Sequence, residues 1–154
     1  MINSANSMCA RITPDIEKVM ESLLIEIDRN LLFSIAFADT LPHISELCDE
    51  IAEESALHLK ELGKMLLVNG CNPTLRLYVT MSSVDTCSDK PARIQNTALS
   101  VVNYNISTKR KIAAYLRTMI SNEVIRKYGD CFEILNSIYL SELKRIELLQ
   151  EQLN

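Results

Sequence analysis

The sequence predicts an all-α fold, a four-helix bundle with one long crossover connection. Its 154 residues include only three Gly and four Pro, too few turn-forming residues for a β-sandwich or a disordered chain. Apolar residues recur every three or four positions along four long stretches, which is the spacing of amphipathic helices. This spacing is lost at about residues 70–92, which are enough to cross the length of a bundle. Apolar residues alternate with others over residues 75–81, which leaves a short strand or a packed loop open there.

Proline marks both ends of the first predicted helix. Thr13 and Pro14 form a helix start, because a capping hydroxyl precedes proline at the first helical position. Residues 1–12 are then expected to form a flexible N-terminal segment, and residues 13–154 a single bundle domain. Pro42 ends this helix, because proline lacks the N–H group that a continuing helix needs.

The remaining helices follow from glycine, proline and capping residues. The second is predicted over residues 43–69 and stops at Gly70, since glycine accepts the left-handed conformation common at helix ends. The third is predicted over residues 92–120, directly after a proline. A Ser-Asn-Glu cap starts the fourth, over residues 121–154, in which Gly129 is a weak point that costs about 1 kcal/mol relative to alanine.

Charge and hydropathy exclude two classes of partner. The net charge is −4 and the basic residues are scattered, so we expect no nucleic-acid partner, which requires a concentrated basic face. The one basic run, residues 109–111, is interpreted as a solvated helix face. The longest apolar stretch, residues 31–38, is much shorter than the roughly 20 residues that span a bilayer, so we expect no membrane partner.

The cysteines favour a reducing compartment. Their number, five, is odd, and no two are spaced as a Cys-x-x-Cys pair. Neither a disulfide framework nor a zinc site is supported, and we expect these thiols to act as small apolar residues. The first dozen residues lack the apolar core of a signal peptide, so the expected localisation is cytoplasmic.

Polar residues interrupt the middle of each predicted inward stripe. Side-by-side helices of similar length bring these positions to one level, so we expect a buried polar layer across the bundle. The residues are Asn30 in the first helix, Ser55 and His58 in the second, Thr108 in the third, and Glu142 and Arg145 in the fourth.

Several segments resemble the ferritin-like, rubrerythrin-type proteins. Residues 51–58 (IAEESALH), with residues 66–73 beyond them, are similar to the second helix of that family, which commonly reads EExxHxxxL and then LGGxP. Residues 108–115 resemble its third helix, and residues 138–149 its fourth. The resemblance implies a ferritin-like bundle that binds two iron or manganese ions, using one Glu from each of two helices and a Glu-x-x-His pair from each of the others.

Carried over position by position, the resemblance implies a degenerate metal site. Only two of the family's ligand positions keep a ligand, namely His58 and Glu142. The other former metal-site positions hold Asn30, Ser55 and Thr108 in place of glutamate, and Arg145 in place of histidine.

The loss of three carboxylates and the presence of an arginine argue against a bound metal. Arginine is permanently protonated, so Arg145 cannot ligate a cation and repels any that comes near. We expect Arg145 to pair with Glu142, and the other members of the layer to complete a hydrogen-bonded, metal-free network. If a metal does bind, His58 and Glu142 are its expected ligands, and Glu26 or Glu54 joins them only if the alignment shifts by one residue.

Two functions follow from this sequence. The first is a non-catalytic ferritin-like protein with no catalytic residue and no cofactor, acting by assembly or by binding a partner. The alternative is a metal-binding oxidoreductase that uses iron or manganese in peroxide, oxygen or iron chemistry. A homodimer or higher homo-oligomer is expected, because Leu24, Leu31, Leu32 and Phe33 give the first helix more apolar surface than one inward stripe needs.

Overall fold

The computed structural model describes residues 4–71 and 97–154 and is all-helical over these two ranges, as predicted. No strand occurs within them; the alternating residues 75–81 and most of the predicted crossover lie outside the described residues. The helices are α1 (Ser4–Phe37), α2 (Pro42–Val68), α5 (Ala98–Ile120), α6 (Glu123–Arg126) and α7 (Gly129–Glu151).

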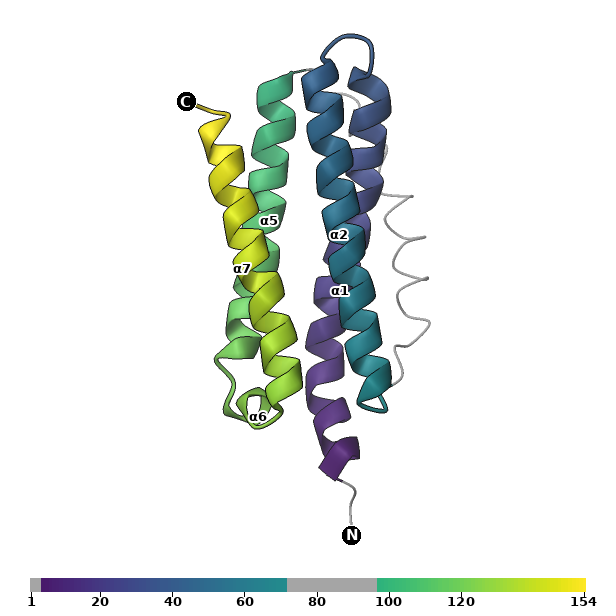
Figure 1. Ribbon diagram of the computed structural model, residues 1–154, viewed down its shortest axis with the longest axis vertical. Helices are drawn as coiled ribbons and strands as arrows, with labels where there is room; N and C mark the ends of the chain where they lie inside the picture. Colours follow the sequence, from purple (N-terminus) through teal and green to yellow (C-terminus); the bar gives the residue numbers. More distant parts are fainter. Residues whose placement is uncertain (1–3, 72–96) are drawn as a thin grey trace.

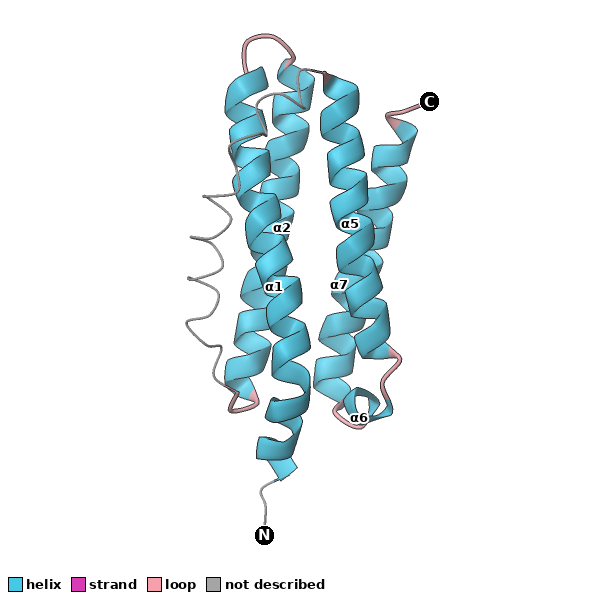
Figure 2. Cartoon of the chain, turned by 180° about the vertical axis from the view of Figure 1, so that it is seen from behind, coloured by secondary structure: helices cyan, strands magenta, loops and turns pink. Residues whose placement is uncertain are grey.

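The four long helices lie side by side (Figures 1 and 2). α1 packs against α2 and α5, and α7 packs against α5 and α2, so each long helix has two long neighbours. Neighbouring helices run antiparallel, whereas α2 and α5 run parallel on a diagonal (Figure 1). α2 therefore ends at one end of the four long helices and α5 begins at the other end, which agrees with the predicted long connection.

The first helix begins earlier than predicted. α1 starts at Ser4 rather than Thr13, so much of the expected N-terminal segment 1–12 is helical and Pro14 lies inside the helix. A proline inside a helix costs about 3 kcal/mol or more. Ile12 and Ile16 on either side of it are both buried and extend the apolar stripe of α1, so packing offsets this cost.

The predicted end of the second helix is confirmed at Gly70. Its φ of 74° is the left-handed conformation that glycine adopts without steric strain. The Gly70 N–H donates to the Leu67 carbonyl at 3.1 Å, and the Cys71 N–H donates to the Leu66 carbonyl at 2.8 Å. These two bonds satisfy carbonyl groups at the helix end, as in a Schellman motif.

The predicted fourth helix is two helices. Asn122 caps α6 as expected, because its side chain accepts a hydrogen bond from the Val124 N–H at 2.9 Å. The chain then breaks at Tyr128, and Gly129 is the first residue of α7 rather than a weak point inside a longer helix. Ile125 of the short helix α6 lies in the core, with 2% of its surface exposed.

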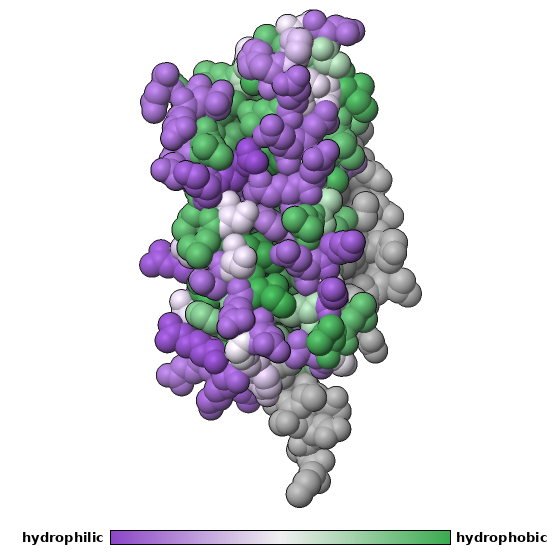
Figure 3. All heavy atoms as spheres, in the orientation of Figure 1, coloured by the Kyte–Doolittle hydropathy of each residue, from purple (hydrophilic) through white to green (hydrophobic). Residues whose placement is uncertain are grey.

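The core is divided along the helix axes. One apolar cluster is built from the first half of α1, the second half of α2, and the α5–α7 end that includes α6; it contains Leu23, Leu62 and Leu135. The other cluster lies toward the α1–α2 turn and contains Phe33 and Ile51. The buried polar residues occupy intermediate positions on each helix, so a polar layer separates the two clusters. The outer face in Figure 3 is largely hydrophilic, with scattered apolar side chains.

Candidate functional site

The centre of the molecule is a polar layer to which all four long helices contribute. Its members are at most 5% exposed, so every charge and hydrogen-bonding group in it depends on protein partners. We define the central layer as Glu26, Asn30, Ser55, His58, Asn105, Lys109 and Glu142.

Lys109 is the hub of the central layer. Its Nζ lies 3.0 Å from Glu26 Oε2 on α1 and 3.0 Å from Glu142 Oε2 on α7. It also donates to Glu142 Oε1 at 3.1 Å and to Ser55 Oγ at 3.2 Å. The ammonium of α5 thus links the other three long helices through charge-assisted hydrogen bonds, which are the stronger class.

Ser55 and His58 also contact the two carboxylates. The Ser55 hydroxyl donates to Glu26 Oε2 at 2.7 Å. His58 Nδ1 lies 2.9 Å from Glu142 Oε1, so the imidazole holds this carboxylate from the side of α2. Both residues were predicted members of the layer, and both side chains reach it because positions three apart on a helix share a face.

A reciprocal amide pair lies beside the charged groups. Asn30 Nδ2 donates to Asn105 Oδ1 at 2.8 Å, and Asn105 Nδ2 donates to Asn30 Oδ1 at 3.0 Å. Each amide also donates to a carbonyl one turn earlier in its own helix, those of Glu26 and Val101. The pair therefore joins α1 to α5 with both of its amide groups used as donors and acceptors.

The carboxylates outnumber the ammonium in this layer. Burial raises the pKa of Glu26, and neighbouring Glu142 raises it further against the lowering effect of Lys109 and Ser55. Burial lowers the pKa of Lys109, but the carboxylates of Glu26 and Glu142 outweigh it and leave that pKa above its usual value. Lys109 thus stays an ammonium, held between the two carboxyl groups. Glu26 Oε1 has no hydrogen-bond partner.

The third-helix position was predicted one residue too early. Thr108 is half-buried and bonds to Tyr104, outside the central layer. Its neighbour Lys109 points inward with none of its side chain exposed, so the interpretation of residues 109–111 as a solvated face is wrong at Lys109. The inward stripe runs through Val101, Asn105, Lys109 and Ile112, a spacing of four, four and three residues.

Arg145 does not neutralise the central layer. It lies at the edge of the bundle, where Nη2 and Nε contact Glu54 Oε2 at 2.7 and 3.0 Å, and Nη1 lies 3.5 Å from Glu50 Oε2. The expected Arg145–Glu142 pair is therefore wrong, because Arg145 reaches sideways to α2 while Glu142 points to the centre. The cation that faces Glu142 is Lys109.

Lys109 was not predicted as a member of the layer, and Glu26 was predicted to reach it only if the alignment shifts by one residue. Glu26 lies one helical turn before Asn30, next to the position expected to face the core, and it is fully buried. Its position relative to Leu23 and Asn30 was the available signal. Lys109 carried a weaker signal, because a lysine beside two other basic residues is usually at the surface.

The central layer does not fit a di-metal centre. Glu26, His58 and Glu142 are potential ligands, but the Lys109 ammonium lies between the two carboxylates and takes the place a cation needs. An ammonium is a donor only and repels a second cation. Across residues 4–71 and 97–154, no group of three or more His, Cys, Asp or Glu side chains is arranged to hold a metal ion.

The cysteines differ from expectation at one place. Cys9 of α1 and Cys71 beyond α2 form a disulfide with a Cα–Cα distance of 5.3 Å, although their separation of 62 residues gave no sequence signal. Cys9 lies in the part of α1 that precedes Pro14, which the sequence places in a flexible segment. Cys48 and Cys131 are free and buried, and burial raises the pKa of the Cys48 thiol to about 12.

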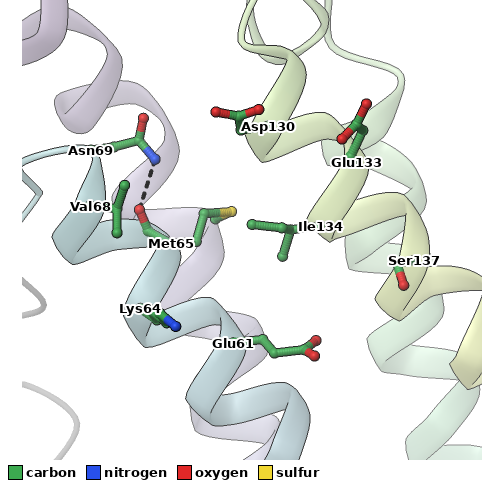
Figure 4. Close-up of a pocket in the computed structure, with 9 residues that line it drawn as sticks. All are labelled: Glu61, Lys64, Met65, Val68, Asn69, Asp130, Glu133, Ile134 and Ser137. Atoms are coloured by element: carbon green, nitrogen blue, oxygen red, sulfur yellow. Dashed lines mark hydrogen bonds between the residues drawn. The ribbon is translucent and has the colours of Figure 1, made fainter.

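A pocket of about 520 Å³ opens near the disulfide end, between α2 and α7. Met65 and Ile134 face each other across it, and Glu61, Asp130 and Glu133 lie around it (Figure 4). The hydrogen bond drawn in Figure 4 lies at the end of α2, where Asn69 Nδ2 donates to the Met65 carbonyl at 2.8 Å, and it does not reach across the pocket to α7. These side chains form an open surface groove with no converging ligand set.

No protein-family model matches this chain, and no curated protein matches it at a significant level. The ferritin-like resemblance therefore stays a prediction based on the residues quoted above. None of the helices in the described ranges combines the length and the apolar character needed to cross a membrane.

Proposed function

We propose that this protein is a non-catalytic, ferritin-like helical protein whose di-metal site has been replaced by a metal-free polar network. The observation that carries the proposal is the position of Lys109 Nζ, 3.0 Å from both Glu26 and Glu142. An internal ammonium already faces both carboxylates and offsets one of their two charges, so the layer holds a cation without a metal ion. In this proposal the protein acts by assembly or by binding a partner.

Elemental analysis tests the metal-free core. Protein purified from medium supplemented with iron and manganese is expected to contain neither metal in stoichiometric amount. The reason is that a divalent ion must displace the Lys109 ammonium from two buried carboxylates. A stoichiometric metal that survives dialysis, and that is lost in His58→Ala protein, refutes the proposal.

The alternative, a metal-binding oxidoreductase using iron or manganese, has one observation in its favour. Glu26, His58 and Glu142 converge in the central layer, and all three are metal-ligating residue types. Peroxide turnover that requires added metal and disappears in His58→Ala protein favours this alternative. Equal turnover in wild-type and His58→Ala protein excludes the central layer as its source.

Self-association is the proposed mode of action, and α1 supplies its surface. Leu31, Leu32 and Ile35 are 47%, 52% and 75% exposed, and they lie within little more than one turn of the helix. Two other residues predicted for this surface do not fit as well: Phe33 is buried and Leu24 is half-buried, because both contribute to the inward side.

Sedimentation tests this surface. Wild-type protein is expected to sediment as a homodimer or higher homo-oligomer, and Ile35→Glu is expected to dissociate it, because a charge is placed among exposed apolar residues. Leu57→Glu on α2, where Leu57 is 55% exposed, is the matched control and is expected to leave the assembly intact. A monomeric wild-type mass refutes self-association.

The proposed compartment is the cytoplasm, and the Cys9–Cys71 pair tests it. Disulfides persist in oxidising compartments and are rare in the cytosol, so this pair is expected to be reduced in the living cell if the proposal holds. Alkylation of free thiols at the moment of lysis, followed by mass spectrometry, measures this state. A fully oxidised pair in the cell refutes the cytoplasmic assignment.

A further inference from the structure

The oxygen atoms around Lys109 Nζ are arranged as cation ligands. Glu26 Oε2, Glu142 Oε2, Glu142 Oε1 and Ser55 Oγ lie 3.0, 3.0, 3.1 and 3.2 Å from the nitrogen. They come from α1, α7 and α2, whereas the nitrogen comes from the remaining long helix, α5. Three helices thus supply the ligands and the fourth supplies the cation.

We propose that the central layer is a cation-binding site whose occupant is the Lys109 ammonium, and that shortening this side chain opens the site to one free divalent cation. This inference rests on the proposed metal-free core. It adds that Lys109 alone keeps ions out, and that the remaining residues are sufficient to bind one.

Charge favours a divalent ion once the ammonium is gone. Glu26 and Glu142 then face each other as buried carboxylates with no positive partner, and each is fully inaccessible to solvent. A divalent cation neutralises both at once, whereas a monovalent cation leaves one charge uncompensated.

Two further groups are already placed to assist. His58 Nδ1 lies 2.9 Å from Glu142 Oε1, so the imidazole is adjacent to the site. Glu26 Oε1 has no hydrogen-bond partner and is an acceptor free to turn toward an ion. The donors must move inward by about 1 Å, because metal–oxygen and metal–nitrogen distances are near 2.1 Å.

Cobalt binding to a Lys109→Ala variant tests the proposal. Alanine removes the ammonium and most of the stem, which leaves a space among Glu26, Ser55 and Glu142. Addition of Co²⁺ to this variant is expected to give one bound ion per chain and the visible absorption of coordinated cobalt. At a concentration about 100 times the dissociation constant, Tm is expected to rise by about 5–10 °C.

Matched variants locate the ion. Lys109→Met removes the charge but keeps the space filled, so it is expected to bind no Co²⁺. Lys109→Ala combined with Glu142→Gln removes a carboxylate that contacts the ammonium, and it is expected to bind at least tenfold more weakly than Lys109→Ala. Equal binding by all three proteins overturns the proposal, because the ion is then bound elsewhere.

Each outcome for Lys109→Ala either supports or overturns the inferred cation site. If this variant folds and binds no Co²⁺, the inference is wrong and the proposed metal-free function stands. If it is unfolded alone, Co²⁺ is expected to restore its helical circular dichroism, and failure to do so also overturns the inference. Stoichiometric Co²⁺ binding at the central layer of the wild-type protein refutes the proposed function instead.

Discussion

Replacement of Lys109 by methionine is expected to destabilise the protein more than any single surface change. The two side chains have similar length, so the variant keeps the core filled and loses mainly the ammonium. Glu26 and Glu142 then remain as fully buried carboxylates without a cation. Removal of one partner from a buried ion pair costs about 3–5 kcal/mol, which for a chain of this size lowers Tm by about 6–20 °C.

The pH dependence of this loss identifies its cause. Burial raises the pKa of Glu26 in the folded protein, and loss of the neighbouring ammonium raises it further. Because the folded pKa of this carboxyl group is raised from 4.5, the group carries no penalty below that pH, and stability is lost as the pH rises through the folded value. The deficit of Lys109→Met relative to wild type is therefore expected to be smaller at pH 4.5 than at pH 7.

Urea unfolding followed by circular dichroism measures these differences. Adding Glu26→Gln and Glu142→Gln to Lys109→Met removes both buried charges and is expected to restore most of the lost stability at pH 7. Lys144→Met is the matched control: the Lys144–Glu147 pair is at the surface, with side chains 63% and 61% exposed, so a change below about 0.5 kcal/mol is expected. A loss below about 1 kcal/mol for Lys109→Met, or one of equal size at both pH values, refutes the buried ion-pair account.

Three further predictions concern other bonds of the structure. Since the pKa of Glu26 is raised from 4.5 by burial, wild-type stability is expected to fall relative to Glu26→Gln as the pH rises above 4.5, and parallel urea curves for the two proteins contradict this. Reduction of the Cys9–Cys71 disulfide, which spans 62 residues, is expected to cost up to about 4 kcal/mol in thermal unfolding, and an unchanged Tm after complete reduction rules out a stabilising bond. Asn105→Ala leaves the Asn30 amide without its partner and is expected to cost about 1–3 kcal/mol, whereas a neutral effect shows that the amide pair adds no stability.

Helix boundaries were predictable where a single residue determines them. Gly70 ends α2 because its backbone is left-handed, and Asn122 begins α6 because its side chain caps the helix. Pro14 misled the prediction, since proline suits a helix start and the burial of Ile12 and Ile16 overrides that local preference. Local rules fail there because the deciding contacts come from other helices.

The sequence predicts how far along the helices the polar layer lies, but not which of its side chains bond to one another. Asn30, Ser55, His58 and Glu142 lie where their stripes predict. The third helix is the exception, because a one-residue shift exchanges Thr108 for Lys109 and so exchanges a neutral side chain for the central cation. A helical stripe spans more than one adjacent position, so periodicity alone does not choose between neighbours.

The identity of the buried cation could not be read from residue type. Arg145 and Lys109 both lie near the level of Glu142, and only packing decides which of them points inward. Arg145 finds Glu54 and Glu50 at the edge of α2, whereas Lys109 has two carboxylates and no solvent within reach. The cation that faces Glu142 therefore belongs to α5, whereas the predicted one, Arg145, belongs to α7.

The disulfide also determines how the molecule transmits mechanical force. It joins the beginning of α1 to the residue just beyond α2, so the hairpin formed by these two helices is a closed covalent ring. When the two chain ends are pulled apart, tension passes from Cys9 to Cys71 through the sulfur atoms and bypasses the intervening chain. At about 3.4 Å per extended residue, the disulfide across these 62 residues shortens the fully extended chain by about 210 Å. Under load, tension in the oxidised protein passes through α5, α6 and α7, while α2 and the part of α1 after Cys9 stay out of the line of force.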